Sequence, residues 1–268
     1  MKKLKLNGIL FLLLLLTAFL PGCGNAGQGR TARVGVRDSV PGFGYKNPIS
    51  GTYSGMEVEL AKMLAEAMGY SEVEFTGVTA ESREQVLTDN AVDFVVATFT
   101  ITEERRQEFD FSAPYYTNYV RIMVEDSSLF QSLSDLKGKC IGITAGSTSA
   151  LYLAEEMVSL GLIPEFDTGS FDSSVFSGGI SFRQFETYPD LIAALEEGNI
   201  DAACSDGSIL AGYMNEERSF LPETFSRQEL GVCTPKGSPL SPKIQTQIDQ
   251  WQTDGRLDSL MKKWDLNE

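Results

Sequence analysis

The sequence predicts an α/β protein built as two similar lobes that two crossover strands join. In the first half of the 268-residue chain, a strand, a polar loop and a helix follow one another three times, which is typical of a mostly parallel sheet. A new first strand at 140–143 starts a second unit of the same kind. A strand at 119–124 leads out of the first unit and a late strand at 230–234 follows the second, and we interpret these two strands as the crossovers.

Each strand of the first unit precedes a helix. The strand at 34–36 is followed by a helix with acidic residues in its first turn, apolar residues at helical spacing and Gly69 as its stop. A strand at 73–75 precedes a helix that Ser82 caps, and the third strand lies at 93–97. In such sheets ligands bind beyond the carboxyl ends of the strands, so the loops after these strands are candidate sites.

The second unit contains the same kinds of element. Its loop at 144–149 offers backbone N–H groups and hydroxyls, which either cap the next helix or hold an anion. The segment 165–180 has no clear period and is either a surface excursion or a hairpin. Further strands are predicted at 182–185 and 201–205, and helices at 150–160, 188–197, 207–214, 241–251 and 256–264.

The stretch from Thr98 to Arg106 combines a helix start with an unexpected cation. Thr102 is a good N-cap, because its hydroxyl can accept a hydrogen bond from a free backbone N–H of the first turn. Arg105 then lies near the positive end of the helix dipole, where a cation is unfavourable. Either Arg105 pairs with a nearby glutamate on a solvated face, or it holds an anion together with the helix N-terminus.

Three arginines are predicted at one edge of the first sheet. Arg37 follows the first strand, Arg83 lies in the first turn of the second helix, and Arg105 lies at the start of the third. In a chain with a formal net charge of −15, three converging arginines predict a site for an anion. In the second unit, Asp206 at a strand end is either an N-cap or a carboxylate placed to meet a ligand cation.

The N-terminal segment 1–22 is predicted to be a secretory signal rather than part of the fold. A start with three lysines precedes an apolar run at 9–20, which is too short for a comfortable transmembrane span. Removing these lysines changes the net charge from −15 to −15 − 3 = −18. Residues 23–32 have no periodic pattern and are predicted to be a tether.

Composition excludes several classes of function. A chain this acidic lacks the broad basic face that nucleic-acid binding requires. It contains no histidine, which removes Ser-His-Asp and Cys-His catalytic sites, HExxH metal sites and histidine general bases. Cys140, Cys204 and Cys233 show no metal-type spacing; either two of them form a disulfide or all three are small buried residues.

At these motifs the sequence resembles the bacterial extracellular solute-binding proteins, specifically the polar amino-acid-binding family that serves ABC importers. The segments 55–60, 93–116 and 202–213 carry the resemblance, which covers nearly all of the chain after the signal. It implies two Rossmann-like lobes of the type II periplasmic-binding-protein architecture. It places lobe 1 at 33–120 and 231–268, and lobe 2 at 121–230.

The resemblance also implies roles for individual residues. A ligand α-carboxylate would be held by Arg105, Thr100 and Thr148, with backbone groups near Thr98. The α-ammonium would be met by Asp206, with acceptors near Thr98. Both are charge-assisted pairs that closure of the cleft would desolvate. At position 56 the chain carries Met where the family has an aromatic or another aliphatic residue.

Two positions predict the ligand side chain. By the resemblance, Arg37 falls where binders of basic amino acids or glutamine carry aspartate, and Arg83 falls where acidic-amino-acid binders place a second arginine. Two cations in the side-chain pocket require an anion, so we expect L-glutamate or L-aspartate. The alternative is that the arginines face solvent and pair with Asp38 or Glu84.

The expected protein is therefore the substrate-binding lipoprotein of an amino-acid ABC transporter, with no catalytic residues, no metal and no cofactor. Cys23, directly after the apolar run, resembles a lipidation site, which implies an extracytoplasmic monomer anchored to the cell membrane beside its permease. The alternative to lipidation is ordinary cleavage of the signal, which would leave the Cys23 thiol free. Two rival functions remain: binding of another polar amino acid, and a carboxylate-dependent dehydratase on the same scaffold.

Overall fold

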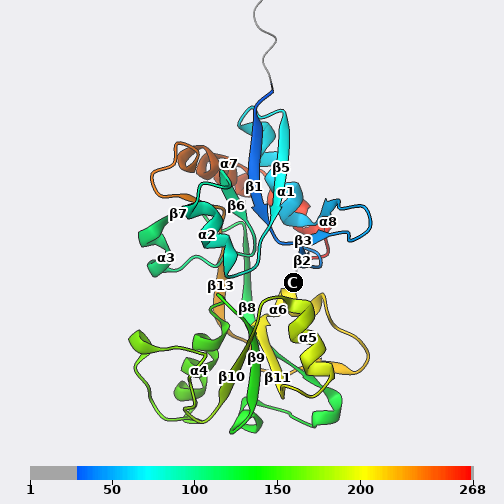
Figure 1. The fold of residues 1–268 in the computed structure, drawn as a ribbon, viewed down its shortest axis with the longest axis vertical. Coiled ribbons are helices and arrows are strands. Elements are labelled where there is room, and N and C mark those ends of the chain that lie inside the picture. The colour runs from blue at the N-terminus through cyan, green and yellow to red at the C-terminus, as the bar shows by residue number, and fades with distance from the viewer. Residues whose placement is uncertain (1–28, 267–268) are drawn as a thin grey trace, which may run out of the picture.

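The computed structural model describes residues 29–266 and contains two α/β lobes stacked along the long axis (Figure 1). Strands β8 (Tyr116–Glu125) and β13 (Phe225–Leu230) connect them and pair antiparallel to each other. The predicted class, two α/β lobes joined by two crossover strands, is confirmed. The predicted signal, Cys23 and most of the predicted tether lie outside the described residues.

The sheet of lobe 1 has five strands with a parallel half and an antiparallel half. In spatial order they are β5 (Glu72–Gly77), β1 (Thr31–Val36), β6 (Phe94–Val96), β14 (Cys233–Pro235) and β7 (Phe109–Phe111). Strand β1 is parallel to both β5 and β6, whereas β14 is antiparallel to β6 and β7. The predicted C-terminal boundary of the tether, residue 32, is two residues too late, because Thr31 and Ala32 already pair with β5 and Ala32 is buried.

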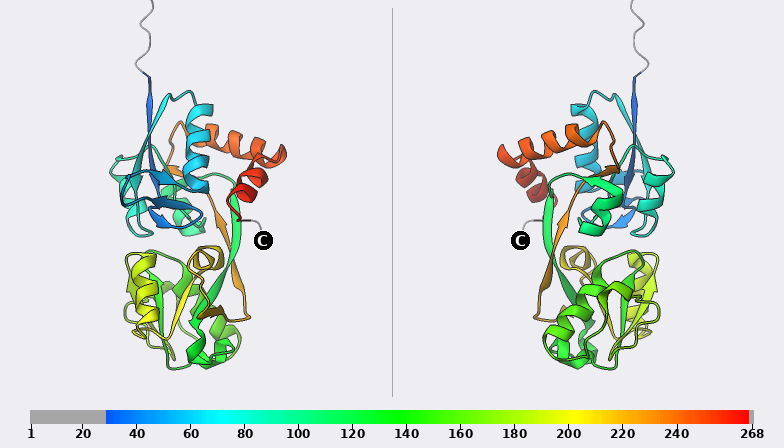
Figure 2. Two further views of the ribbon diagram at one scale, coloured as in Figure 1. Left: turned by 90° about the vertical axis from the view of Figure 1, so that its right-hand side faces the viewer. Right: turned by 90° about the vertical axis from the view of Figure 1, so that its left-hand side faces the viewer.

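Helices cover both faces of this sheet. They are α1 (Met56–Ala67), α2 (Ser82–Thr88), α3 (Glu103–Glu108), α7 (Ser241–Thr253) and α8 (Arg256–Lys263). The C-terminal helices α7 and α8 pack beside α1 on one side of the lobe (Figure 2). A small antiparallel sheet of β2 (Ser39–Val40), β3 (Gly44–Lys46) and β4 (Tyr53–Ser54) fills the turn-rich segment before α1.

Lobe 2 is built on a six-stranded sheet. Its strands are β10 (Ser181–Phe185), β9 (Cys140–Thr144), β11 (Ala202–Asp206), β8 and β12 (Arg218–Phe220), with β13 paired to β8. Its helices are α4 (Ser149–Ser159), α5 (Tyr188–Glu196) and α6 (Gly207–Ala211), with single 3-10 turns η1 (Asp126–Ser128), η2 (Leu133–Leu136) and η3 (Thr168–Ser170). Strands β9, β10 and β11 are parallel, so their carboxyl ends point the same way.

Three local predictions differ from the structure. The late strand predicted at 230–234 is the junction of two strands, because β13 ends at Leu230 and β14 begins at Cys233. Ser82 is not an N-cap but the first residue of α2. Within 165–180 there is no hairpin; three phenylalanines of this segment contact one another in tilted and edge-to-face arrangements, with ring centroids 5.1–5.5 Å apart, and pack on the core of lobe 2.

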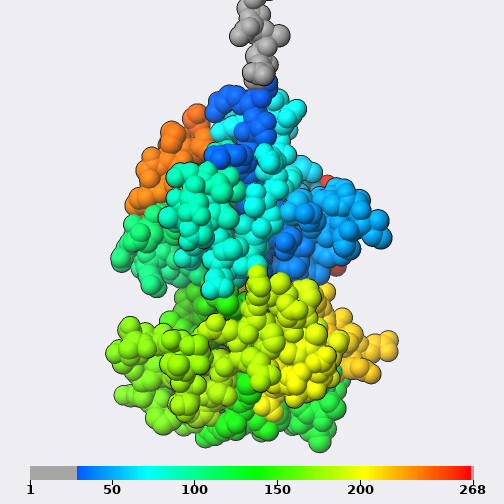
Figure 3. All heavy atoms as spheres, viewed as in Figure 1, coloured from blue at the N-terminus to red at the C-terminus, as the bar shows by residue number. Residues whose placement is uncertain are grey.

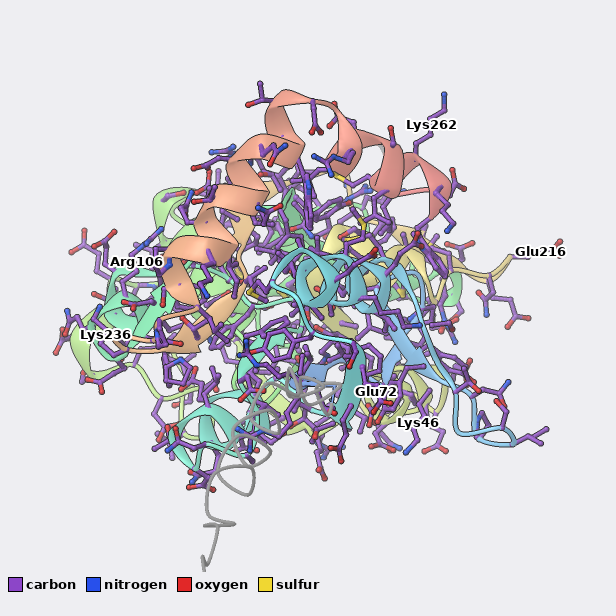
Figure 4. The ribbon with its side chains drawn as sticks, turned by 90° about the horizontal axis from the view of Figure 1, so that it is seen from above. Lys46, Glu72, Arg106, Glu216, Lys236 and Lys262 are labelled. Carbon is purple, nitrogen blue, oxygen red and sulfur yellow. The ribbon has the colours of Figure 1, made fainter. Side chains whose placement is uncertain are left out.

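The thiols that the structure describes are free. Cys204 and Cys233 are buried and Cys140 is half-buried, and none of the three forms a disulfide. Charged side chains such as Arg106, Glu216 and Lys236 point outward when the molecule is viewed from above (Figure 4). Within residues 29–266, no helix has the length and apolar character needed to cross a bilayer.

Candidate ligand-binding site between the lobes

A narrow cavity of about 10 Å³ lies between the lobes, which meet closely at the waist of the molecule (Figure 3). Its walls come from the segments that follow the carboxyl ends of β5, β6, β9, β10 and β11, as expected for parallel strands. The lining residues are Ala80, Arg83, Thr98, Thr100, Ser147, Thr148, Ser149, Tyr188, Ser205, Asp206 and Ile209. Five of the seven predicted site residues are among them.

Arg83 forms the lobe 1 wall. It is 3% exposed, and its Nη1 donates to the backbone carbonyls of Ala97 at 3.0 Å and Thr98 at 2.8 Å. Its guanidinium lies 4.1 Å from the ring centroid of Phe99, and its Nε is buried without a hydrogen-bond partner among the described residues. Burial first, and then the charges of Arg105 and Arg37, lower its pKa to about 9. An anion placed here would raise that pKa again.

Arg105 spans the seam between the lobes. Its Nη1 donates to the Thr100 carbonyl in lobe 1, and its Nη2 donates to the Gly146 carbonyl in lobe 2, both at 2.9 Å. Its Nε pairs with Glu84 at 3.2 Å. The helix α3 has only six residues, so Arg105 also lies in its last turn. A cation is favourable at that end of the helix dipole, which offsets the unfavourable effect at the N-terminal end. Thr102 caps α3 as predicted, accepting from the Arg105 N–H at 3.1 Å.

Arg37 lies one layer behind the cavity. It follows β1, has no exposed surface, and stacks at 5.6 Å from the ring centroid of Tyr188, which does line the cavity. All three of its guanidinium nitrogens are buried and lack hydrogen-bond partners among the described residues. The predicted alternative of solvent-facing pairs is wrong for both arginines, because both are buried and Glu84 pairs with Arg105 instead.

Lobe 2 supplies the opposite charge. Asp206 stands at the N-cap position of α6 but makes no side-chain capping bond, so capping does not explain its presence. It is 6% exposed, and burial raises its pKa to about 6, against the effects of the Asn118 amide and of Arg83 and Arg105. An ionised carboxylate here requires a cation partner.

Each crossover strand brings one buried amide to the site. Asn118 of β8 interacts with Asp206 and donates to Ser208 at 2.6 Å. Gln228 of β13 accepts a hydrogen bond from the Thr148 hydroxyl at 3.0 Å. The two crossover strands therefore hold the cavity residues Asp206 and Thr148 in position as well as joining the lobes. Sequence reasoning missed both amides, because a polar residue inside a strand pattern carries no sign of what it faces.

A wider groove of about 530 Å³ adjoins the cavity on the α3 side. Arg105 and Thr148 line it, together with Glu104 and Glu108 of α3 and the residues Phe171 to Ser173 of the segment after α4. That segment, which sequence reasoning left unassigned, thus forms the outer lip of the seam. Among the described residues no cluster of histidine, cysteine, aspartate or glutamate has the geometry of a metal site.

Two hinged lobes that enclose a cavity with guanidinium groups on one side and a carboxylate on the other define a binding protein for a small charged molecule. Comparison with known proteins agrees: residues 32–267 match the bacterial extracellular solute-binding proteins, family 3, and the chain belongs to that family. The predicted type II periplasmic-binding-protein architecture is likewise confirmed.

The names of similar proteins state different ligands. The ABC transporter glutamine-binding protein GlnH of Bacillus subtilis (strain 168) is 32% identical over 236 residues, which cover 86% of this chain and 79% of GlnH. The glutamate-binding protein GluB of Corynebacterium efficiens is 26% identical over 262 residues, covering 88% and 82%. An ancestral arginine-binding protein bound to arginine is 30% identical with a TM-score of 0.73, covering 87% of this chain and 97% of that one.

Proposed function

We propose that this protein is the solute-binding component of an amino-acid ABC importer and that its ligand is L-glutamate or L-aspartate. The transport role is supported by membership of the family and by relatives named as amino-acid-binding proteins. Since those relatives differ in their named ligands, the ligand has to be inferred from this chain's own cavity. The observation that carries the acidic assignment is the pair of buried arginines, Arg37 and Arg83.

The proposed ligand matches the charges around the cavity. Its α-carboxylate is assigned to Arg105, with the hydroxyls of Thr100 and Thr148, and its α-ammonium to Asp206. The side-chain carboxylate is assigned to Arg83 and Arg37. A buried cation without a partner costs about 3–5 kcal/mol relative to the paired state, and Arg37 has no hydrogen-bond partner in the described chain. A second carboxylate supplies that partner, whereas glutamine or arginine does not.

A catalytic role has less support. Few acid–base groups line the cavity: Asp206 is the one carboxylate that lines it within the described chain, and the sequence contains no histidine. In the proposed binding mode Asp206 is paired with an ammonium, which removes it as a general base. The protein is therefore proposed to bind its ligand outside the cytoplasm and to deliver it chemically unchanged to a permease. Cys23 is proposed as its lipid anchor.

A thermal-shift panel of the common L-amino acids, followed by titration calorimetry, tests the assignment. Glutamate and aspartate are expected to raise the melting temperature, and arginine and glutamine are expected to leave it unchanged. Tight binding of arginine or glutamine without binding of either acid would overturn the acidic assignment while leaving the transport role intact.

Closure of the lobes depends on Gly146. Its backbone has φ +72, and a Cβ atom there would lie 2.6 Å from the Glu81 Cα and 2.8 Å from the Ala80 carbonyl oxygen. Gly146→Ala is therefore expected to hold the lobes apart and weaken ligand binding about tenfold or more, since such overpacking costs about 1–3 kcal/mol. Calorimetry measures the loss.

Gly138→Ala is the matched control. Gly138 has φ +74 and no heavy atom within 4 Å of its built Cβ, so the substitution introduces the same backbone strain without the contact between lobes. It is expected to lower stability and leave affinity unchanged. Equal affinities of the two variants would show that Gly146 has no role in closure.

A further inference from the structure

Glu57 is a buried acid that the proposed ligand contacts do not use. It lies in the first turn of α1 and has no exposed surface. Its Oε1 accepts a hydrogen bond from the Thr98 backbone N–H at 2.6 Å and another from the Tyr115 hydroxyl at 2.5 Å. Its Oε2 is buried and has no hydrogen-bond partner among the described residues. An acid in the first turn of a helix ordinarily serves the helix dipole from the surface, so this one requires another explanation.

The first consequence of these contacts concerns backbone geometry. Thr98 has φ +45, a left-handed conformation that costs a non-glycine residue about 1–2 kcal/mol. The hydrogen bond from its N–H to Glu57 stabilises that conformation. The carbonyl of the same residue accepts a hydrogen bond from Arg83 at 2.8 Å. Glu57 therefore acts on Arg83 through the backbone of Thr98.

The second consequence concerns charge. The groups that face Glu57 are the Thr98 N–H, the neutral hydroxyl of Tyr115 and the charges of Arg37 and Arg83. Its negative charge offsets the two arginines when no anion is bound. Burial outweighs these favourable contacts and raises the pKa of Glu57 to about 7. The carboxyl thus lies close to the balance between its two protonation states.

We propose that Glu57 is a positioning residue of the ligand site and the resident counter-charge of Arg37 and Arg83, and that Glu57 takes up one proton when an acidic ligand binds. The inference rests on the proposed function, because it needs a ligand carboxylate beside both arginines. Two neighbouring carboxylates repel each other, so one becomes protonated. The proton comes from solvent and is placed on Oε2, which leaves Oε1 free to accept both existing hydrogen bonds.

The test is calorimetry of glutamate binding at pH 8 in phosphate and in Tris, whose ionisation enthalpies differ. Wild-type protein is expected to take up nearly one proton per ligand bound. Glu57→Gln keeps an acceptor for the Thr98 N–H but carries no charge. It is expected to take up none, and to bind glutamate about tenfold more tightly than wild type at pH 8 but equally at pH 6. Proton uptake in this variant equal to that of wild type would overturn the proposal.

Tyr115→Phe is the matched control, because it removes a hydrogen bond to Oε1 but keeps the titrating carboxyl. Proton uptake is expected to persist in it. A role limited to packing or to the hydrogen bond would instead give Tyr115→Phe and Glu57→Gln the same uptake, and that result would count against the proposal.

A ligand-free measurement separates this inference from the proposed function. Because the folded protein holds the Glu57 proton more tightly than the unfolded chain, stability is lost as pH rises towards and through about 7. The wild-type folding constant is expected to fall about tenfold more than that of Glu57→Gln between pH 6 and pH 8. If no acidic amino acid binds, the proposed function fails, whereas identical pH profiles of the two ligand-free proteins would reject a titrating Glu57.

Discussion

Arg37→Met is expected to abolish high-affinity binding of glutamate and aspartate while making the ligand-free protein more stable. The variant keeps most of the side-chain volume but removes a buried guanidinium with no hydrogen-bond partner in the described chain. Replacing a whole buried ion pair by apolar groups of similar volume is neutral or stabilising by about 1–4 kcal/mol. Here only Arg37 is replaced, but its counter-charge, Glu57, has a pKa raised to about 7 and becomes neutral by taking up a proton once the arginine is gone. Loss of this buried positive charge, which attracts the ligand carboxylate from one layer behind the cavity, should weaken binding about a hundredfold, equivalent to about 3 kcal/mol.

Chemical denaturation and calorimetry measure the two effects separately. Arg106→Met is the control, since it removes the same charge from a side chain that points to solvent (Figure 4); neither quantity should change appreciably. An Arg37→Met protein that loses stability and keeps its affinity for glutamate would show that Arg37 is a structural residue and not part of ligand recognition.

Asp206→Asn is expected to weaken binding of every amino acid about a hundredfold or more, because a buried ammonium then loses its charged partner. The loss of affinity should be the same whatever side chain the amino acid carries, whereas Arg37→Met should weaken binding of acidic amino acids only. Comparison of several ligands by calorimetry checks this. A variant that loses glutamate but gains glutamine would place Asp206 in the side-chain pocket instead.

The pH dependence of wild-type binding follows from the same carboxyl. The pKa of Asp206 is raised to about 6, so the ligand-free protein takes up a proton there as pH falls through 6. The contribution of Asp206 to the folding stability therefore rises as pH falls below 6. It stops rising when the unfolded chain also becomes protonated, near the ordinary pKa of an aspartate. Affinity changes in the opposite direction: below pH 6 it should fall about tenfold per unit, because the ammonium requires the ionised form. Together with Glu57 this places maximal affinity between about pH 6 and 7.

Sequence reasoning succeeded where local pattern and chain direction determine the structure. The runs around Val34, Val95 and Ala203 are short, apolar and bounded by polar loops, and each became a strand. Since parallel strands end at one edge, the order of elements was enough to bring Arg83 and Asp206 to one cavity.

It failed where a role depends on contacts between distant segments. Glu57 has the spacing of an ordinary first-turn acid, and only the approach of Tyr115, 58 residues later, makes it a buried acceptor. The pairing of Thr148 with Gln228 likewise depends on how β13, 80 residues later in the chain, lies against the start of α4 within lobe 2. Neither the periodicity of hydrophobic residues nor a single-residue propensity contains that information.

The order of strands in lobe 1 has a consequence for how the chain folds. Strand β14, from near the C-terminal end of the fold, lies between β6 and β7, which both belong to the first half. The sheet of lobe 1 therefore remains split until residues 233–235 arrive, whereas the sheet of lobe 2 is assembled from one continuous stretch, 116–230. Long-range pairings of this kind form slowly. We expect lobe 2 to fold first and lobe 1 last, because an interior strand of the lobe 1 sheet is supplied only when residues 233–235 are available.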